Sequence, residues 1–218
     1  MTTRTIHVSN LFSIDLLNRM IDEGFVNRQK HPELDLWIYN YSHTCQFSRV
    51  WNDVTLQCRG LILDADMNIV SRPFSKFFNL EEHPRSDVRF SKKDFQVFEK
   101  LDGSLGILYP TGTRYAIATR GSFTSDQALR ASMLLQERYV DFVPEPGYTY
   151  LFEIIYPDNR IVVDYGGVEG LVFLCAVDNV TGANVFEFGG SGDWPGLKAA
   201  RYDVTCQTCI LSITLRVT

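Results

Sequence analysis

The pattern Lys100-Leu-Asp102-Gly103-Ser combines a nucleophilic side chain with a turn signal. Apolar residues flank it at 95–98 and 105–109, and Asp-Gly between two apolar runs is typical of a hairpin turn, because glycine accepts a positive φ. One interpretation is a hairpin whose lysine points into solvent. The other is a lysine at a strand end whose amine attacks a nucleotide phosphate. These residues alone leave both interpretations open.

Two cations and one carboxylate elsewhere in the chain could support such an attack. Arg59 and a glycine precede a short apolar strand at residues 61–64, where the guanidinium could bring its fork of donors to phosphate oxygens. Lys76 supplies a second cation before the Lys100 pattern. Glu153 interrupts an apolar, β-prone run at 148–156, where a carboxylate is costly to bury unless it has a partner. A ligand or an arginine could be that partner.

Six short motifs together resemble a known enzyme family. They occur in the order found in ATP-dependent RNA ligases of the T-even bacteriophage tRNA-repair type, which belong to the covalent nucleotidyltransferase superfamily. The resemblance extends from about residue 39 to residue 182. The motifs are Gln-Cys-Arg-Gly-Leu-Ile-Leu at 57–63, Ser-Arg-Pro-Phe-Ser-Lys-Phe-Phe-Asn-Leu at 71–80, Lys-Leu-Asp-Gly at 100–103, Thr-Arg-Gly-Ser at 119–122, Phe-Glu-Ile-Ile-Tyr-Pro at 152–157 and Asn-Arg-Ile-Val at 159–162.

The resemblance implies a fold and a reaction. The fold would be an α+β nucleotidyltransferase domain, the ATP-grasp-like adenylation domain of ligases, with mixed or antiparallel sheets and flanking helices. With ATP and Mg²⁺, Lys100 would become lysyl-AMP and pass AMP to an RNA 5′-phosphate, and a 3′-hydroxyl would then displace AMP to seal the strand. DNA ligases and mRNA capping enzymes share the lysine motif, but the motifs around Arg59 and Lys76 favour an RNA ligase.

The resemblance also implies a set of nucleotide-binding residues and leaves the metal ligands unassigned. Tyr39 and Phe78 could equally be aromatic residues of the core. Arg120 stands where the family usually has lysine, which keeps the charge but changes the geometry of the donors. The implied nucleotide-binding residues are Tyr39, Arg59, Lys76, Phe78, Asp102, Gly103, Arg120 and Glu153.

The C-terminal part of the chain departs from the family pattern. Glu169-Gly170 imitates a later Glu-Gly motif, but it precedes a strand that the family's motif follows, so it is interpreted as a turn. Lys198 is the only lysine after Lys100, and no Lys-x-Lys pair is present. We expect an adenylyltransferase domain over residues 1–203, incomplete at its C-terminus, and a divergent tail over 204–218. The alternative function is a catalytically weak or inactive remnant that binds nucleotides or RNA ends.

The composition of the chain limits the kinds of RNA contact and the cellular compartment that we expect for it. The 218 residues are 45% hydrophobic, enough for one sizeable core, and the net charge of −5 gives no overall positive field for RNA. Any contact with RNA ends, tRNA-like or otherwise single-stranded, would therefore be local. Five cysteines without dense spacing suit buried thiols in a reducing cytoplasm, which is the host cytoplasm if the chain is viral. No apolar run is long enough for a membrane span.

Hydrophobic periodicity predicts the elements that would position these residues. Ser13 and Gly24 bracket a helix over 14–21, and strands are expected at 34–41, 61–64, 148–156 and 171–177. A second helix should begin at Thr124 or Ser125. Its Leu129, Met133 and Tyr139 are predicted to share one side.

Overall fold

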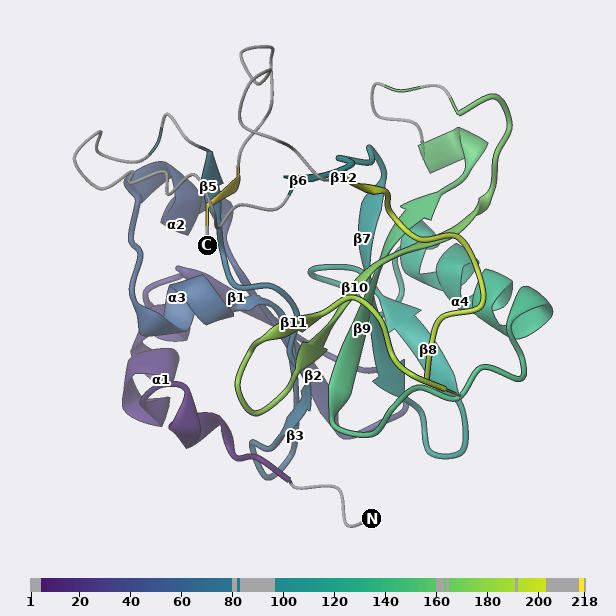
Figure 1. Cartoon of the computed structure of the whole chain (residues 1–218). Coiled ribbons are helices and arrows are strands. Elements are labelled where there is room, and N and C mark those ends of the chain that lie inside the picture. Colours follow the sequence, from purple (N-terminus) through teal and green to yellow (C-terminus); the bar gives the residue numbers. More distant parts are fainter. Residues whose placement is uncertain are drawn as a thin grey trace.

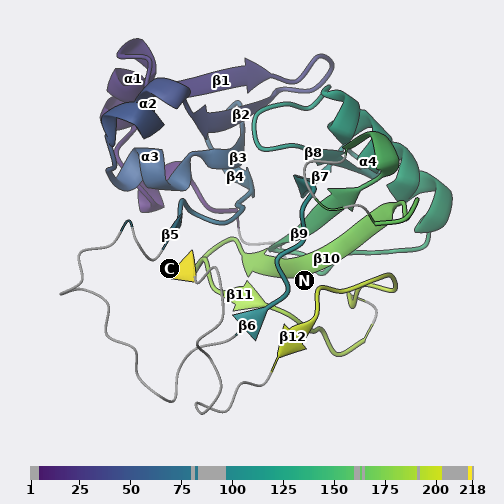
Figure 2. The same cartoon turned by 90° about the horizontal axis from the view of Figure 1, so that it is seen from above.

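Two antiparallel sheets pack face to face, and helices cover their outer faces (Figure 1). This architecture comes from a computed structural model, which describes residues 5–79, 82, 97–159, 163, 165–190, 192–202 and 216–217. Figure 2 shows helices α1, α2 and α3 on one side of the molecule and α4 on the other. The arrangement agrees with the predicted α+β class with antiparallel sheets and flanking helices.

The first sheet comes from the N-terminal third of the chain. Its face toward the helices carries Tyr39, Leu61 and Leu63, which join a core with α1 and α3. The opposite face carries Ile38 and Ile62. In chain order the elements are η1 (Val8–Asn10), α1 (Ile14–Asp22), β1 (Val26–Lys30), β2 (Leu36–Tyr41), α2 (His43–Ser48), α3 (Asp53–Gln57), β3 (Arg59–Asp64) and β4 (Ile69–Ser71), with the strands in the order β1-β2-β3-β4.

The second sheet supplies the other half of the sandwich. Ile107, Leu151 and Val177 pack against the Ile38 and Ile62 face of the first sheet. The far face of the second sheet packs against α4. The elements are β7 (Ser104–Pro110), β8 (Tyr115–Ala118), α4 (Asp126–Arg138), β9 (Tyr148–Ile155), η3 (Pro157–Asn159), β10 (Gly170–Asp178) and β11 (Asn184–Val185), with the strands in the order β11-β10-β9-β7-β8.

Most of the predicted elements are present. Helix α1 begins after Ser13, whose hydroxyl accepts from the Leu16 amide, and the chain leaves it at Gly24 with a φ of 75°.

The prediction of which side of α4 faces the core is wrong. Leu129 and Met133 are each 50% exposed, because small alanines at 128 and 131, with Leu134 and Leu135, form the stripe that meets the sheet.

The predicted hairpin at Asp102-Gly103 is also wrong. Strand β6 (Val97–Phe98) pairs with β12 (Arg201–Tyr202), whereas β7 pairs with β8 and β9. Gly103 is not among the residues with a positive φ. The Lys100 segment is therefore a crossing between two sheets, and residues 95–96 of the expected strand lie outside the described residues.

The expected tail, residues 204–218, lies almost wholly outside the described residues. Within it, β13 (Arg216–Val217) pairs with β5 (Phe78–Asn79). Cys45, Cys58 and Cys175 are buried thiols, as expected, whereas the other two cysteines fall outside the described ranges. No helix in the described part of the chain is long and apolar enough to cross a membrane.

A buried arginine links the two sheets through the turn after β10. The Arg72 backbone N–H donates to the Thr149 hydroxyl at 2.8 Å, and its guanidinium donates to the carbonyl oxygens of Asn179 at 3.3 Å and Val180 at 3.0 Å. Arg72 is 9% exposed, and this burial lowers its pKa from the usual value. The side chain contributes to stability mainly because it satisfies a buried carbonyl group of Asn179 and a partly buried one of Val180.

Replacing Arg72 with methionine should destabilise the fold. Arg72→Met keeps the length of the side chain but leaves two carbonyl groups without their donor, so we expect the free energy of unfolding to fall by about 2–3 kcal/mol. Urea denaturation followed by circular dichroism measures this loss. Arg114→Met, at an exposed position, is the matched control and should change it by less than about 0.5 kcal/mol. Equal losses in the two variants would contradict the role given to Arg72.

Candidate active site

The Lys100 turn, defined as residues 99–104, lies directly against the end of β9. The backbone N–H of Gly103 donates to Glu153 Oε1 at 2.8 Å. The register explains this contact, because Leu105 on β7 pairs with Glu153 and Ser104 pairs with Ile154. Glu153, the one carboxylate of an otherwise apolar strand, therefore meets the backbone of the turn.

Glycine is required at 103 for a steric reason. A Cβ atom there would overlap the carbonyl oxygen of Ile154 and lie 3.2 Å from the Cγ of Glu153. The sequence suggested that this glycine serves a positive φ. The structure shows that it serves the close approach of the turn to β9.

Asp102 is held on two sides by the segment that follows β9. Its backbone N–H donates to the Tyr165 hydroxyl at 2.7 Å, and its Oδ2 accepts from the Val163 backbone N–H at 3.0 Å. Its other oxygen, Oδ1, lies 4.0 Å from Lys100 Nζ. The Asp102 side chain is 14% exposed and the Lys100 side chain is 51% exposed. The lysine is thus accessible from solvent and lies beside a carboxylate that is fixed in place.

The two ends of the turn are also anchored. At one end, the Glu99 N–H donates to the Ala200 carbonyl at 2.8 Å. At the other, the Ser104 hydroxyl donates to Asn159 Oδ1 at 3.1 Å, and Asn159 Nδ2 donates to the Ile154 carbonyl at 2.9 Å. Arg160, expected next to Asn159 in this loop, lies outside the described residues.

Three of the predicted residues, Lys76, Phe78 and Arg120, gather with Tyr41 and Trp51 in a cation–aromatic cluster, defined as these five residues. The Arg120 guanidinium donates to the Tyr41 hydroxyl at 3.2 Å and lies over its ring. The Trp51 ring packs edge-on against Tyr41 and Phe78, with centroid separations of 5.2 and 5.4 Å. Lys76 Nζ lies 4.3 Å from the Phe78 centroid and donates to the Phe77 carbonyl.

Two members of this cluster, Tyr41 and Trp51, were not predicted from the sequence, and for Tyr39 the sequence left a core position and a nucleotide site open. Tyr39 is 3% exposed and belongs to the core under α1 and α3, where burial raises its pKa. It also lines a shallow depression of about 410 Å³ that includes Arg28 and Lys30 but no residue of the Lys100 turn. Tyr41, two residues later on β2, contacts Arg120 instead. Trp51 follows α2 outside every motif, so no sequence signal identified it.

Strand β3 brings Arg59 close to the cation–aromatic cluster. A Cβ atom at Gly60, where φ is 96°, would overlap Ile107 on β7 and lie 3.3 Å from the Arg120 backbone. The neighbouring Arg59 guanidinium lies over the Phe77 ring, 4.7 Å from its centroid. Glycine at 60 thus lets the end of β3, with Arg59, approach both the second sheet and Arg120.

The polar groups around Arg59 suit a nucleotide. Asn40 pairs with Arg59 across β2 and β3, and its buried Oδ1 has no hydrogen-bond partner in the described part of the chain. Arg59, Lys76 and Arg120 are three cations, the kind of side chain that could bind phosphate oxygens. No group of three or more His, Cys, Asp or Glu side chains in the described ranges could hold a metal by itself. Mg²⁺ commonly binds through one or two carboxylates together with substrate phosphates and water, which the carboxylates of Asp102 and Glu153 would allow.

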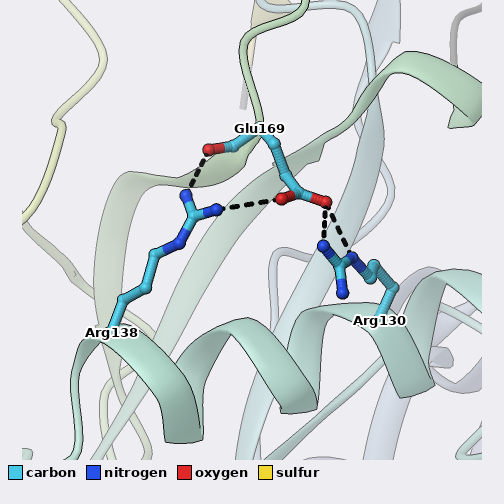
Figure 3. Close-up of polar contacts among 3 residues, drawn as sticks. All are labelled: Arg130, Arg138 and Glu169. Atoms are coloured by element: carbon cyan, nitrogen blue, oxygen red, sulfur yellow. Dashed lines mark hydrogen bonds and ion pairs between the residues drawn. The ribbon is translucent and has the colours of Figure 1, made fainter.

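Glu169 has a structural contact, which agrees with its interpretation as part of a turn rather than as the family's Glu-Gly motif. Figure 3 shows its carboxylate between two arginines of α4. Arg130 pairs with Oε1 through Nε at 2.7 Å and through a second, shorter contact, and Arg138 pairs with Oε2 at 2.9 Å. Arg138 also donates to the Glu169 carbonyl at 2.7 Å. These contacts tie the start of β10 to the helix.

Comparison with known proteins gives a consistent result. The family described as RNA ligase matches residues 57–189, more than half of the chain. A protein of Autographa californica nuclear polyhedrosis virus assigned as a bifunctional polynucleotide kinase/RNA ligase is 29% identical over 203 residues. A protein of Thermovibrio ammonificans assigned as an RNA ligase is 35% identical over 140 residues. The RNA ligase of Rhodothermus phage RM378 is 26% identical over 172 residues.

The matched regions differ in how much of each chain they include. They cover 81% of this chain for the baculovirus protein and 60% for each of the other two. They cover only 29%, 36% and 39% of the three relatives. The chain therefore spans about a third of the length of these proteins.

Adding a methyl group at residue 103 should separate the turn from β9. Gly103→Ala places a Cβ against a backbone carbonyl that cannot move alone, so we expect the free energy of unfolding to fall by about 1–3 kcal/mol. Gly170→Ala is the control, because nothing lies within 4 Å of its Cβ position, and it should change stability by about 0.5 kcal/mol or less. Urea titration of both variants checks the difference, and a Gly103→Ala protein as stable as the Gly170→Ala protein would refute the close approach.

Proposed function

Because the chain belongs to the RNA ligase family, we propose that it carries the adenylation step of an ATP-dependent RNA ligase, with Lys100 as the nucleophile. The observation that supports this most is the hydrogen bond from Gly103 to Glu153 beneath an accessible Lys100. It fixes the backbone around a lysine whose amine remains open to a ligand from solvent. The order of the motifs supports the same assignment.

In the proposed step the Lys100 amine attacks the α-phosphorus of ATP. A nitrogen–phosphorus bond forms, the bond from the α-phosphorus to the bridging oxygen of the β-phosphate breaks, and pyrophosphate leaves with that electron pair. The amine loses a proton to solvent, and the product is a lysyl-AMP phosphoramidate. Asp102, whose Oδ1 lies 4.0 Å from Nζ, would orient the amine for the attack.

The cations would stabilise the negative charge of the phosphates. We assign this role to Arg59, Lys76 and Arg120. Arg59 begins β3 and Lys76 follows β4, both strands of the first sheet, whereas Arg120 follows β8 of the second sheet. Glu153, held next to the turn, would accept a ribose hydroxyl or help hold Mg²⁺, which when bound would neutralise phosphate oxygens. Phe78 and Tyr41 would form apolar walls of the nucleotide site. For Tyr39, the core position favours a structural role instead.

The later steps follow from the family and are proposed for the protein as a whole. AMP would pass from Lys100 to the 5′-phosphate of an RNA end, tRNA-like or otherwise single-stranded, and a 3′-hydroxyl would displace it. Repair of broken tRNA in the cytoplasm, or in the cytoplasm of a host, is the setting that the motifs suggest. The positive charges that would contact RNA are local, because the net charge is −5.

One observation favours a second candidate, binding of nucleotides or RNA ends without transfer. Lys198, the only lysine after Lys100 in the sequence, donates to Asp193 at 2.7 Å. Its amine is thus engaged by a carboxylate on the surface. This candidate predicts a folded chain that binds ATP and never becomes labelled.

Labelling with ATP separates the two candidates. We expect incubation with α-labelled ATP and Mg²⁺ to leave a label on the chain after denaturing electrophoresis. Lys100→Ala should lose the label completely, because no other amine occupies the turn. Lys30→Ala, at an exposed position on β1, should keep the label of the wild type. A folded wild-type chain that binds ATP without labelling would support the second candidate, and labelling of Lys100→Ala would refute the nucleophile.

A further inference from the structure

Two residues between β9 and β10, Val163 and Tyr165, hold Asp102 of the Lys100 turn by hydrogen bonds. Tyr165 accepts a hydrogen bond from the Asp102 backbone N–H, and the Val163 backbone N–H donates to the Asp102 carboxylate. We infer that Tyr165 is a positioning residue for the Lys100 nucleophile. This inference rests on the proposed function, because it concerns the reaction of that lysine.

The backbone hydrogen bonds of the turn explain why one hydroxyl could matter. On the N-terminal side of Lys100, Glu99 is bound to Ala200, and on the C-terminal side the N–H groups of Asp102 and Gly103 are bound to Tyr165 and Glu153. The half-exposed Lys100 side chain has a direction that depends on the backbone from which it starts. Loss of the bond at Asp102 would free the two peptide units that follow Lys100.

Asp102 transmits the same constraint through its side chain. Val163 fixes Oδ2, and the other oxygen, Oδ1, faces Lys100 Nζ at 4.0 Å. A shift of the Asp102 backbone would therefore move the carboxylate and the amine together. Misplacement of reacting groups by about 1 Å can slow a reaction by about 100-fold. A smaller displacement of Lys100 should therefore still lower the rate measurably.

The residues that follow Tyr165 are bound to helix α4. The Val168 N–H donates to the Tyr165 carbonyl at 3.2 Å, which closes a turn, and Glu169 comes next. Its carboxylate is held by Arg130 and Arg138, which lie eight residues apart on the helix (Figure 3). Tyr165 thus stands on a segment that is fixed at its end by two charged contacts.

The test is the rate of lysyl-AMP formation by Tyr165→Phe, followed in single turnovers with α-labelled ATP. The phenyl ring remains, and only the acceptor for Asp102 is removed. We expect the maximal rate to fall about tenfold, while the ATP concentration giving half-maximal rate stays within about twofold and the melting temperature changes little. A purely structural role would instead lower the melting temperature and leave the rate of the folded protein unchanged.

A matched control is Tyr148→Phe, which removes the same atom at the opposite end of β9, and its rate should equal that of the wild type. Glu169→Gln supplies a second variant. It should slow the reaction by about threefold, and combining it with Tyr165→Phe should add nothing further, since both act through one contact.

Each outcome decides the inference. A Tyr165→Phe protein with the wild-type rate, or one in which only the half-maximal ATP concentration rises, overturns it while the proposed function stands. An additive loss in the double variant overturns the link to α4. A wild-type chain that never becomes labelled overturns the inference and the proposed function together.

Discussion

The hydrogen bond between the Gly103 backbone and the Glu153 carboxylate is the contact on which the candidate site depends. Burying a carboxylate in an apolar strand is costly unless hydrogen-bond donors replace water. Glu153 is a partly buried carboxylate in such a strand, and the Lys100 turn provides a donor at 2.8 Å. Strand β9, through Glu153, and the Lys100 turn, through the Gly103 N–H, thus stabilise each other. Because residue 103 is glycine, they can approach closely enough to do so.

The sandwich of two sheets supplies the rest of the site. The apolar layer that contains Ile62 and Ile107 holds the first sheet against the second. Gly60 lets the end of β3, where Arg59 lies, approach Ile107 and the backbone of Arg120 closely. The cations therefore come from both sheets. Their positions depend on the packing between the sheets, as the position of Lys100 depends on β9.

Sequence patterns predicted the elements well and their pairing poorly. Caps and periodicity identified α1 and the strands β2, β9 and β10, because these signals are local. The prediction of a hairpin at 102–103 was wrong. One partner of β7 is β9, about fifty residues away, and local turn signals contain no information about such a distant partner. The stripe of α4 was misassigned because two alanines, weak in hydrophobicity, face the sheet while Leu129 and Met133 face outward.

The same limits apply to the site. Motifs indicated the Lys100 pattern and the family, and the RNA ligase match agrees with them. They could not distinguish Tyr39 from Tyr41, because both lie on β2 and only tertiary packing places one in the core and the other beside Arg120. The contacts of Trp51 and Tyr165 depend on the meeting of distant segments. Residues outside any motif carry no local sign of such contacts.

Peptide mapping by mass spectrometry, after incubation with ATP and Mg²⁺, shows directly whether Lys100 is the nucleophile. We expect one AMP group per chain, attached to the peptide that contains Lys100 and released by acid, as is typical of a phosphoramidate. An AMP group on a peptide that lacks Lys100, or an unmodified Lys100 peptide from a folded chain saturated with ATP, would contradict it.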